Sequence, residues 1–304
     1  MKTLVLNSTI RFTALLILIC SVVLTSGHAQ QYETFKVEVK GKGIPMILIP
    51  GLNSSPEVWN ETIEKYRSNF ECHLVHLAGF AGLKPLSNTD DFTKRVRDDL
   101  IAYIKEEQLK KPVIMGHSLG GFLALWIGSK EPDLVGPLLI IDGLPFLPAI
   151  QMIGATPETT EPMAKGMMTQ MQNQSAEQRA MYARQFLTTM ITDESDLEKA
   201  VEWGKHSDPA TSAQAMYDLY VTDLRNEIAK IKSPTLVLGA WIGFKDYGAT
   251  RENTEPKYQN QFKKIPDHKI KFTDKGKHFI MWDDPDFFFY ETNQFLDKYV
   301  DRNE

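Results

Sequence analysis

The chain has 304 residues, 42% of them apolar, and carries 34 basic and 39 acidic side chains for a net charge of −5. This composition excludes a disordered tail, a collagen-like fibre and a small disulfide scaffold, and two cysteines provide no disulfide framework. The acidic balance argues against nucleic-acid binding, which requires a basic surface.

Residues 1–29 have the features of a secretory signal peptide. Two basic residues precede an apolar run over residues 12–24, and small residues follow at Gly27 and Ala29. Because the apolar run is shorter than the ~20 residues that a spanning helix needs, cleavage after Ala29 is favoured over a membrane anchor. We therefore expect a secreted protein, periplasmic or extracellular, with no stable membrane anchor once the signal is removed.

The mature chain alternates between two kinds of apolar pattern. Short apolar runs bounded by Gly, Pro or polar residues predict buried strands, and segments with apolar residues every three or four positions predict helices. Such alternation is typical of an α/β fold, with a mostly parallel central sheet and helices on both faces. Residues 32–39 alternate like an antiparallel edge strand. The other strands are expected at residues 46–49, 74–77, 113–115, 138–141, 235–238 and 270–272, and the helices at 57–66, 92–107, 120–129 and 287–299.

The alternation stops after residue 141, and residues 147–231 contain only helical patterns. We interpret this segment as a helical cap inserted into the α/β domain. Eight of the twelve methionines lie in it, and Met163, Met167 and Met171 share one helix face. Core packing is the favoured interpretation of this row, and a soft lining for apolar substrates is the alternative. The chain thus divides into a signal peptide (1–29), the first part of the core (30–146), the cap (147–231) and the second part of the core (232–304).

The motif with the strongest chemical meaning is Gly-His-Ser-Leu-Gly at residues 116–120, between a predicted strand and a predicted helix. At such a turn Ser118 takes a strained backbone conformation, and a side chain at either glycine would clash across the turn. The turn lifts the serine oxygen above the carboxyl edge of the sheet and aims the N–H of Leu119 at a developing oxyanion. The motif therefore predicts a nucleophilic serine.

A serine hydroxyl is a weak nucleophile and needs a general base. The chain order serine, acid, histidine selects His278, which follows the last predicted strand. Asp246 and Asp142 each follow an apolar strand and could orient that histidine; we favour Asp246 and keep Asp142 as the alternative. Leu52, in the loop after the first core strand, is the expected second oxyanion donor. This chemistry needs no metal and no cofactor.

These features resemble the α/β-hydrolase superfamily, and most closely its capped esterase and lipase-like branch. The resemblance covers nearly the whole mature chain. It rests on Pro-Gly-Leu at residues 50–52, Gly-His-Ser-Leu-Gly-Gly at 116–121, the helical insertion after the strand at 138–141 (strand six in the numbering of the superfamily) and Gly-x-His-Phe at 276–279. It implies Ser118 as nucleophile, His278 as base, and Leu52 and Leu119 as oxyanion donors.

Two features depart from the superfamily pattern. Many members have His-Gly in the oxyanion loop, where this chain has Pro50-Gly51. The usual acid follows the glycine after strand seven by two or three residues, whereas Asp246 lies seven residues after Gly239. Some lipases of the superfamily place the acid after strand six, and that arrangement would select Asp142.

The sequence thus predicts a secreted serine hydrolase that cleaves carboxylic esters through an acyl-enzyme. The alternatives are an amidase, a thioesterase or a lactonase with the same three residues, and a non-catalytic ligand-binding relative, since the fold alone does not determine function. The expected partner is a small apolar ester and not a nucleic acid, and the expected state is a monomer or a weak homodimer.

Overall fold

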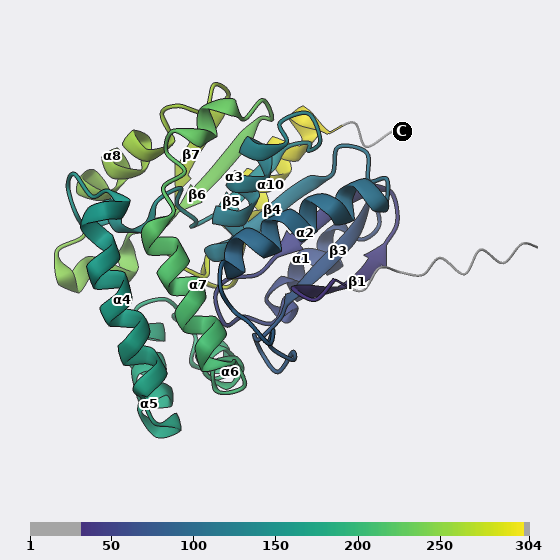
Figure 1. Cartoon of the computed structure of the whole chain (residues 1–304). Coiled ribbons are helices and arrows are strands. Elements are labelled where there is room, and N and C mark those ends of the chain that lie inside the picture. Colours follow the sequence, from purple (N-terminus) through teal and green to yellow (C-terminus); the bar gives the residue numbers. More distant parts are fainter. Residues whose placement is uncertain (1–31, 301–304) are drawn as a thin grey trace, which may run out of the picture. The chain divides into compact units, whose positions relative to one another are not determined.

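A computed structural model describes residues 32–300, so the predicted signal peptide lies outside the described residues. One seven-stranded sheet forms the centre of this part of the chain, in the order β1-β3-β2-β4-β5-β6-β7 (Figure 1). β1 pairs with β3 in antiparallel register at the edge, and the other neighbours are parallel, as predicted. The strands are β1 (Phe35–Gly41), β2 (Ile44–Ile49), β3 (Phe70–Leu77), β4 (Val113–His117), β5 (Leu138–Ile141), β6 (Thr235–Gly239) and β7 (His268–Phe272).

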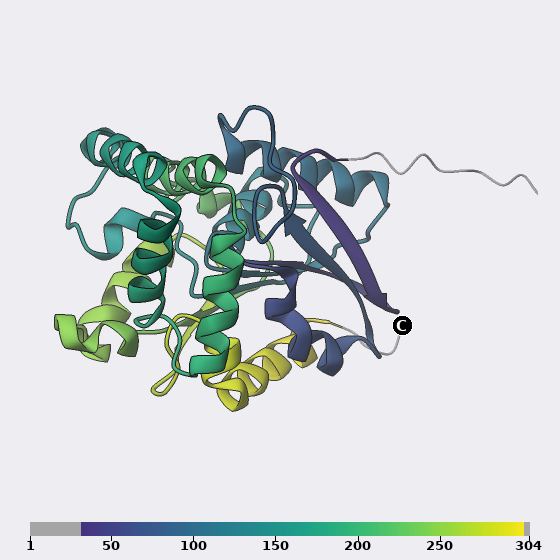
Figure 2. The same ribbon diagram turned by 90° about the horizontal axis from the view of Figure 1, so that it is seen from below.

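Helices cover both faces of the sheet, because the central strands are apolar on both sides. In β2, Ile47 and Ile49 enter one buried cluster whereas Met46 and Leu48 enter the other, as the two-residue period of a strand requires. Figure 2 shows α2 on one side of the sheet and α1 with α10 on the other. The helices of the core are η1 (Pro56–Trp59), α1 (Asn60–Tyr66), α2 (Phe92–Glu106), α3 (Leu119–Lys130), η4 (Ile242–Tyr247), α8 (Arg251–Phe262), α9 (Ile280–Asp283) and α10 (Pro285–Tyr299).

Between β5 and β6 the described chain contains helices and no strand. Four of these helices begin at a side chain that accepts a hydrogen bond from a backbone N–H of the first turn, namely Thr156, Ser175, Asp193 and Asp208. α4 and α7 lie side by side in both views (Figures 1 and 2). The helices of the insertion are η2 (Leu147–Ile150), α4 (Pro157–Asn173), α5 (Ala176–Leu187), α6 (Glu194–Lys205), α7 (Pro209–Val221) and η3 (Glu227–Lys230).

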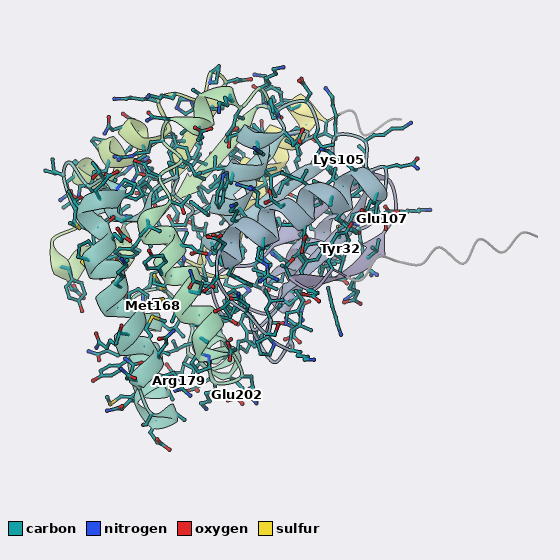
Figure 3. All side chains as sticks on the ribbon, in the orientation of Figure 1. Tyr32, Lys105, Glu107, Met168, Arg179 and Glu202 are labelled. Atoms are coloured by element: carbon teal, nitrogen blue, oxygen red, sulfur yellow. The ribbon has the colours of Figure 1, made fainter. Side chains whose placement is uncertain are left out.

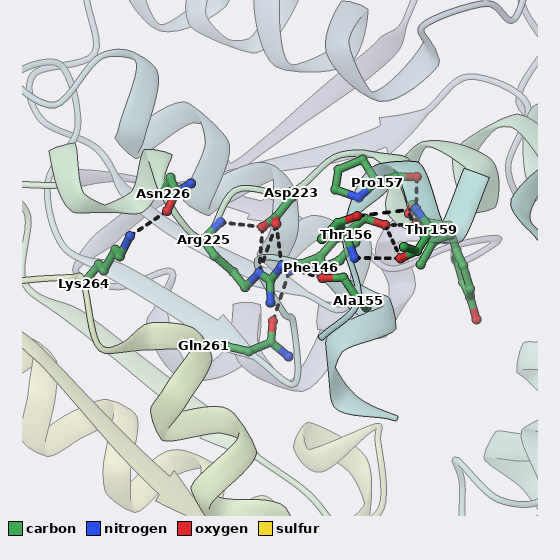
Figure 4. Close-up of polar contacts among 12 residues, drawn as sticks. Phe146, Ala155, Thr156, Pro157, Thr159, Asp223, Arg225, Asn226, Gln261 and Lys264 are labelled. Atoms are coloured by element: carbon green, nitrogen blue, oxygen red, sulfur yellow. Dashed lines mark hydrogen bonds and ion pairs between the residues drawn. The ribbon is translucent and has the colours of Figure 1, made fainter. Parts of the chain in front are cut away.

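The first and last segments of the insertion contact each other through Ala155 and Arg225 (Figure 4). Arg225 donates to the Asp223 carboxylate at 2.6 Å and to the carbonyl oxygen of Ala155 at 2.8 Å. Its guanidinium also lies over the ring of Phe146, 4.8 Å from the centroid. The N–H of Phe146 in turn donates to the side-chain oxygen of Gln261 in α8. The insertion is therefore joined to the core where the Arg225 guanidinium lies over the Phe146 ring.

The methionines of the insertion lie at its surface or are partly buried, as is Met190, which packs against a buried apolar cluster. None of the eight is buried; Met163 is 41% exposed, Met181 is 56% exposed and Met168 is half-buried (Figure 3). The buried residues of α4 are Thr160 and Ala164 instead. Core packing, the favoured interpretation of the row at 163, 167 and 171, is wrong for the exposed Met163 and stays a prediction for Met167 and Met171, which are partly buried. Between residues 32 and 300, no helix has both the length and the apolar content that a bilayer span requires.

Candidate active site

Ser118 sits at a strained turn between β4 and α3. Its φ and ψ are 54° and −114°, a region that residues with a side chain rarely adopt. A Cβ on Gly116 would lie 2.1 Å from the carbonyl oxygen of Gly120, and a Cβ on Gly120 would lie 2.1 Å from that of Ile49. Both positions therefore require glycine, as the motif predicts. The N–H of Ser118 donates to the Ile141 carbonyl at 2.9 Å, which ties the turn to β5.

The two predicted oxyanion segments both reach this serine. Leu119 is the first residue of α3, so its N–H has no acceptor within the helix and lies at the positive end of the helix dipole. A Cβ on Gly51 would lie 3.2 Å from the Cβ of Ser118, so the loop at residues 50–52 passes in van der Waals contact with the serine. The structure thus brings the loop of Leu52 to Ser118, and the donor role of the Leu52 N–H stays a prediction.

His278, in the loop after β7, is paired with Asp142. Its Nδ1 lies 2.6 Å from Oδ2 of Asp142, and the two side chains are only 15% and 10% exposed. Among residues 32–300 this carboxylate is the only hydrogen-bond partner of the His278 ring, so Nε2 is left unpaired. The structure brings together two of the predicted residues, the histidine and the alternative acid.

The preference for Asp246 is corrected by this geometry. Asp246 lies on the short helix η4, where its side chain is exposed, and it is not a partner of His278. The residue directly after β6 contributes a backbone donor to this site and not a carboxylate. The N–H of Ala240 donates to Oδ1 of Asp142 at 2.9 Å. Ala240, directly after β6, therefore supports the carboxylate of Asp142, directly after β5.

Tyr258 completes the surroundings of Asp142 and was missed by the sequence analysis. Its hydroxyl lies 2.5 Å from Oδ1 of Asp142, and the residue is 4% exposed. Burial raises the pKa of the Tyr258 hydroxyl well above its usual value, and the nearby Asp142 charge adds to the effect, so the phenol remains a proton donor. The Tyr258 and Phe262 pair, four residues apart, indicates a buried face of α8, but nothing local points to the distant carboxylate.

His117, beside the nucleophile, is buried against the loop of His278. The two imidazole centroids are 4.6 Å apart, and Nε2 of His117 donates to the backbone carbonyl of His278 at 3.2 Å. Burial lowers the pKa of His117 well below its usual value, and the proximity of His278 lowers it further. His117 is therefore a neutral imidazole that supports the His278 backbone.

The helical insertion is hydrogen-bonded to both loops of the site. Phe279, next to His278, donates its N–H to the Met190 carbonyl at 3.2 Å, and Lys277 donates to the Thr188 carbonyl at 2.7 Å. On the other side, Ser212 of α7 donates to the side-chain oxygen of Asn53, in the oxyanion loop, at 2.5 Å. The insertion therefore borders the site. Within the described residues, no group of three or more His, Cys, Asp or Glu side chains is arranged to hold a metal ion.

Comparison with known proteins gives a consistent result. Residues 46–291 match the model of a family described as the alpha/beta hydrolase family. Over 204 residues the chain is 22% identical to a pimeloyl-[acyl-carrier protein] methyl ester esterase of Aliivibrio salmonicida, covering 65% of this chain and 73% of that protein. Over 260 residues it is 23% identical to the N-formylmaleamate deformylase of Pseudomonas putida, covering 84% and 90%.

Solved structures show the same architecture. A thermophilic esterase from Thermogutta terrifontis superposes with a TM-score of 0.70 at 18% identity, covering 87% of this chain and 93% of that one. At this level of identity the likeness concerns the fold alone.

Proposed function

The chain belongs to the alpha/beta hydrolase family, and from that membership and the geometry around Ser118 we propose that it cleaves carboxylic esters through an acyl-enzyme. The observation that carries the proposal is the 2.6 Å hydrogen bond from His278 Nδ1 to Asp142. It is accompanied by the strained backbone of Ser118 at the start of α3. A carboxylate at Nδ1 keeps the proton there, so that Nε2 has the lone pair a general base requires.

In the proposed reaction, Oγ of Ser118 attacks the ester carbonyl carbon while Nε2 of His278 takes the hydroxyl proton. The N–H groups of Leu119 and Leu52 stabilise the oxyanion of the tetrahedral intermediate. His278 then gives its proton to the departing alcohol, and the acyl group remains on Ser118. A water, deprotonated by the same nitrogen, releases the acid and restores the serine hydroxyl. Asp142 stays ionised and stabilises the imidazolium throughout.

The contact between Oγ and Nε2 belongs to the substrate complex in this scheme. Hydrogen bonds of catalytic groups are often long in the free enzyme and tighten when substrate binds. Since Asp142 binds Nδ1 of His278, Nε2 is the ring nitrogen that is available for this contact.

The test of the nucleophile compares Ser118, at the start of α3, with Ser129, inside the same helix. We expect Ser118→Ala to abolish labelling by a fluorophosphonate and to lower kcat/KM to the residual enhancement of ~10³–10⁴-fold over water. Ser129→Ala is the matched control, because Ser129 is also buried and donates only to the Trp126 carbonyl within its own helix. Labelling of the Ser118 variant, or activity within tenfold of wild type, would contradict the proposal.

The proposed substrate is a small ester with an apolar acyl group. The insertion that borders the site carries eight methionines, none of them buried, and such side chains adapt to apolar ligands. We propose that the insertion and the core enclose an apolar acyl pocket beside Ser118. Each buried methylene contributes roughly 0.8 kcal/mol, so kcat/KM should rise up to about fourfold per acyl carbon until this proposed pocket is full. A panel of p-nitrophenyl esters measures this, and a profile that is flat or highest at acetate would exclude the proposed pocket.

A second candidate is hydrolysis of an amide bond. It is favoured by the deformylase match, which covers 84% of this chain against 65% for the esterase match. Rates on an ester and an amide of the same acid separate the two, and we expect the ester to react faster. A faster amide would move the proposal from esters to amides and leave the roles of Ser118 and His278 unchanged.

We also propose that the protein is secreted, to the periplasm or the medium, by way of a signal peptide at residues 1–29, and acts as a monomer or weak homodimer without nucleic acid. The support is the basic, apolar and small-residue order of that segment. N-terminal sequencing of the protein recovered outside the cytoplasm should begin at Gln30. A chain that still begins at Met1 would contradict the proposal.

A further inference from the structure

The carboxylate of Asp142 is held from three directions. Oδ2 accepts the hydrogen bond from His278, while Oδ1 accepts one from the Tyr258 hydroxyl at 2.5 Å and one from the Ala240 N–H at 2.9 Å. The donors come from separate elements, the loop after β7, helix α8 and the end of β6. Asp142 itself has φ 48°, and its N–H donates to the Leu238 carbonyl at 2.7 Å. The backbone and both carboxylate oxygens are thus fixed.

Two donors on one oxygen determine how the carboxylate plane is turned. A carboxylate rotates easily about its last side-chain bond, because that torsion has a broad energy profile. With Oδ1 fixed by Tyr258 and Ala240, rotation would break two hydrogen bonds, and Oδ2 therefore stays directed at His278. Hydrogen bonds to an ionised acceptor are stronger than those between neutral groups, so the phenol of Tyr258 is a substantial part of this restraint.

The ring of Tyr258 is held independently of its hydroxyl. It packs edge-on against Phe272, with centroids 5.0 Å apart, and stacks on Phe262. A phenylalanine at this position keeps these contacts and removes only the hydrogen bond to Asp142. The hydroxyl can therefore be tested separately from the packing.

We propose that Tyr258 is a positioning residue of the hydrolase: its hydroxyl holds Oδ1 of Asp142 so that Oδ2 stays aligned with Nδ1 of His278. The kinetic consequence of this inference rests on the proposed function, whereas the alignment of Asp142 with His278 does not. Tyr258 acts through Asp142 and does not touch the reacting atoms.

The experiment compares Tyr258→Phe with wild type and with Tyr103→Phe. Tyr103 is the matched control, because its hydroxyl is also buried and lies 2.7 Å from the side chain of His73. His73 belongs to β3, near the opposite edge of the sheet, and is separated from β5 by β2 and β4. For Tyr258→Phe we expect kcat to fall by about tenfold to about 100-fold and KM to change by less than about threefold. Tyr103→Phe should leave both constants near those of wild type.

A second readout does not depend on turnover. In ¹⁵N-histidine-labelled protein, the hydrogen-bonded Nδ1 proton of His278 gives a resonance far downfield, assigned by its loss in His278→Gln. We expect Tyr258→Phe to move this resonance upfield and to speed its exchange with water, and Tyr103→Phe to leave it in place.

The outcomes separate the two proposals. A wild-type protein that hydrolyses no ester removes the proposed function, and the resonance then decides the role of Tyr258 by itself. An unchanged resonance in folded Tyr258→Phe overturns the positioning role, whatever the activity. If the wild type is active, the positioning role is also overturned when Tyr258→Phe keeps a kcat within threefold of wild type, or when Tyr103→Phe loses as much kcat as Tyr258→Phe.

Discussion

Replacement of Asp142 by Asn tests how the site is assembled, because the structure dictates how the new amide must lie. Oδ1 accepts hydrogen bonds from both Tyr258 and Ala240, so the amide must turn its oxygen to these two donors. Its NH₂ group then faces Nδ1 of His278, where Oδ2 was. Two donors cannot pair, and the imidazole proton must therefore move to Nε2.

An imidazole protonated at Nε2 cannot accept the proton of Ser118. We therefore expect Asp142→Asn to lower kcat by up to ~10⁴-fold, about 5 kcal/mol in the activation barrier. Global stability should change much less, because the side chain keeps its shape and two of its three hydrogen bonds. Hydrolysis of a p-nitrophenyl ester gives kcat, and a thermal melt of the same sample checks the fold.

Asp246→Asn is the control for this substitution. Asp246 is an aspartate of the same size on the exposed helix η4, so its replacement should leave kcat within about twofold of wild type. A kcat within tenfold of wild type for Asp142→Asn would refute the tautomer argument. A larger loss from Asp246→Asn than from Asp142→Asn would return the role of the acid to the residue that the sequence favoured.

Three further outcomes test the surroundings of the site. Gly116→Ala should destabilise the fold by at least about 2 kcal/mol in urea unfolding, because the new Cβ would lie 2.1 Å from the Gly120 carbonyl oxygen. Gly166→Ala is the control: this glycine lies in α4 with open space around it, so the substitution should stabilise the fold by up to about 1 kcal/mol. Equal effects of the two substitutions would contradict the clash at Gly116. Burial holds the pKa of His117 well below its usual value, so below pH ~6.5 the unfolded state binds a proton that the folded state does not. The free energy of unfolding should therefore fall as the pH is lowered, and it should fall less in His117→Gln, where the buried His73 and the half-buried His76 still contribute; an equal fall in the two proteins would contradict the role of His117. Burial also raises the pKa of the Cys72 thiol to about 11, so an aromatic disulfide reagent at pH 8 should modify it only after unfolding, and rapid modification of the native protein would show the thiol to be accessible.

The parts of the site that could be predicted from the sequence are those with a local signal. Ser118 is marked by its two glycines together with the strand before it and the helix after it, all within a few residues. His278 is marked by its place after the last strand and by chain order. The sheet and its helices follow from apolar periodicity, since central parallel strands must be buried on both faces.

The acid could not be selected in this way. Asp142 and Asp246 both follow an apolar strand, and the local pattern is the same for each. The choice depends on which strand end approaches His278 and on donors from elsewhere, namely Tyr258 and the Ala240 N–H. Tyr258 lies in α8, a helix of mostly polar sequence, 116 residues from Asp142 along the chain. Only the tertiary structure brings the two together.

The pairing of His278 with Asp142, which directly follows β5, also gives the segment after β6 a supporting role. Its first residue, Ala240, donates its N–H to Asp142, and three residues later Gly243 packs so closely on the insertion that a Cβ there would lie 2.0 Å from the Thr189 carbonyl oxygen. Thr189 belongs to the same connection, between α5 and α6, that accepts the N–H of Phe279 at Met190. The segment after β6 and the loop of His278 therefore contact one stretch of the insertion. We therefore expect a displacement of that stretch to disturb the support of Asp142 and the loop of His278 together.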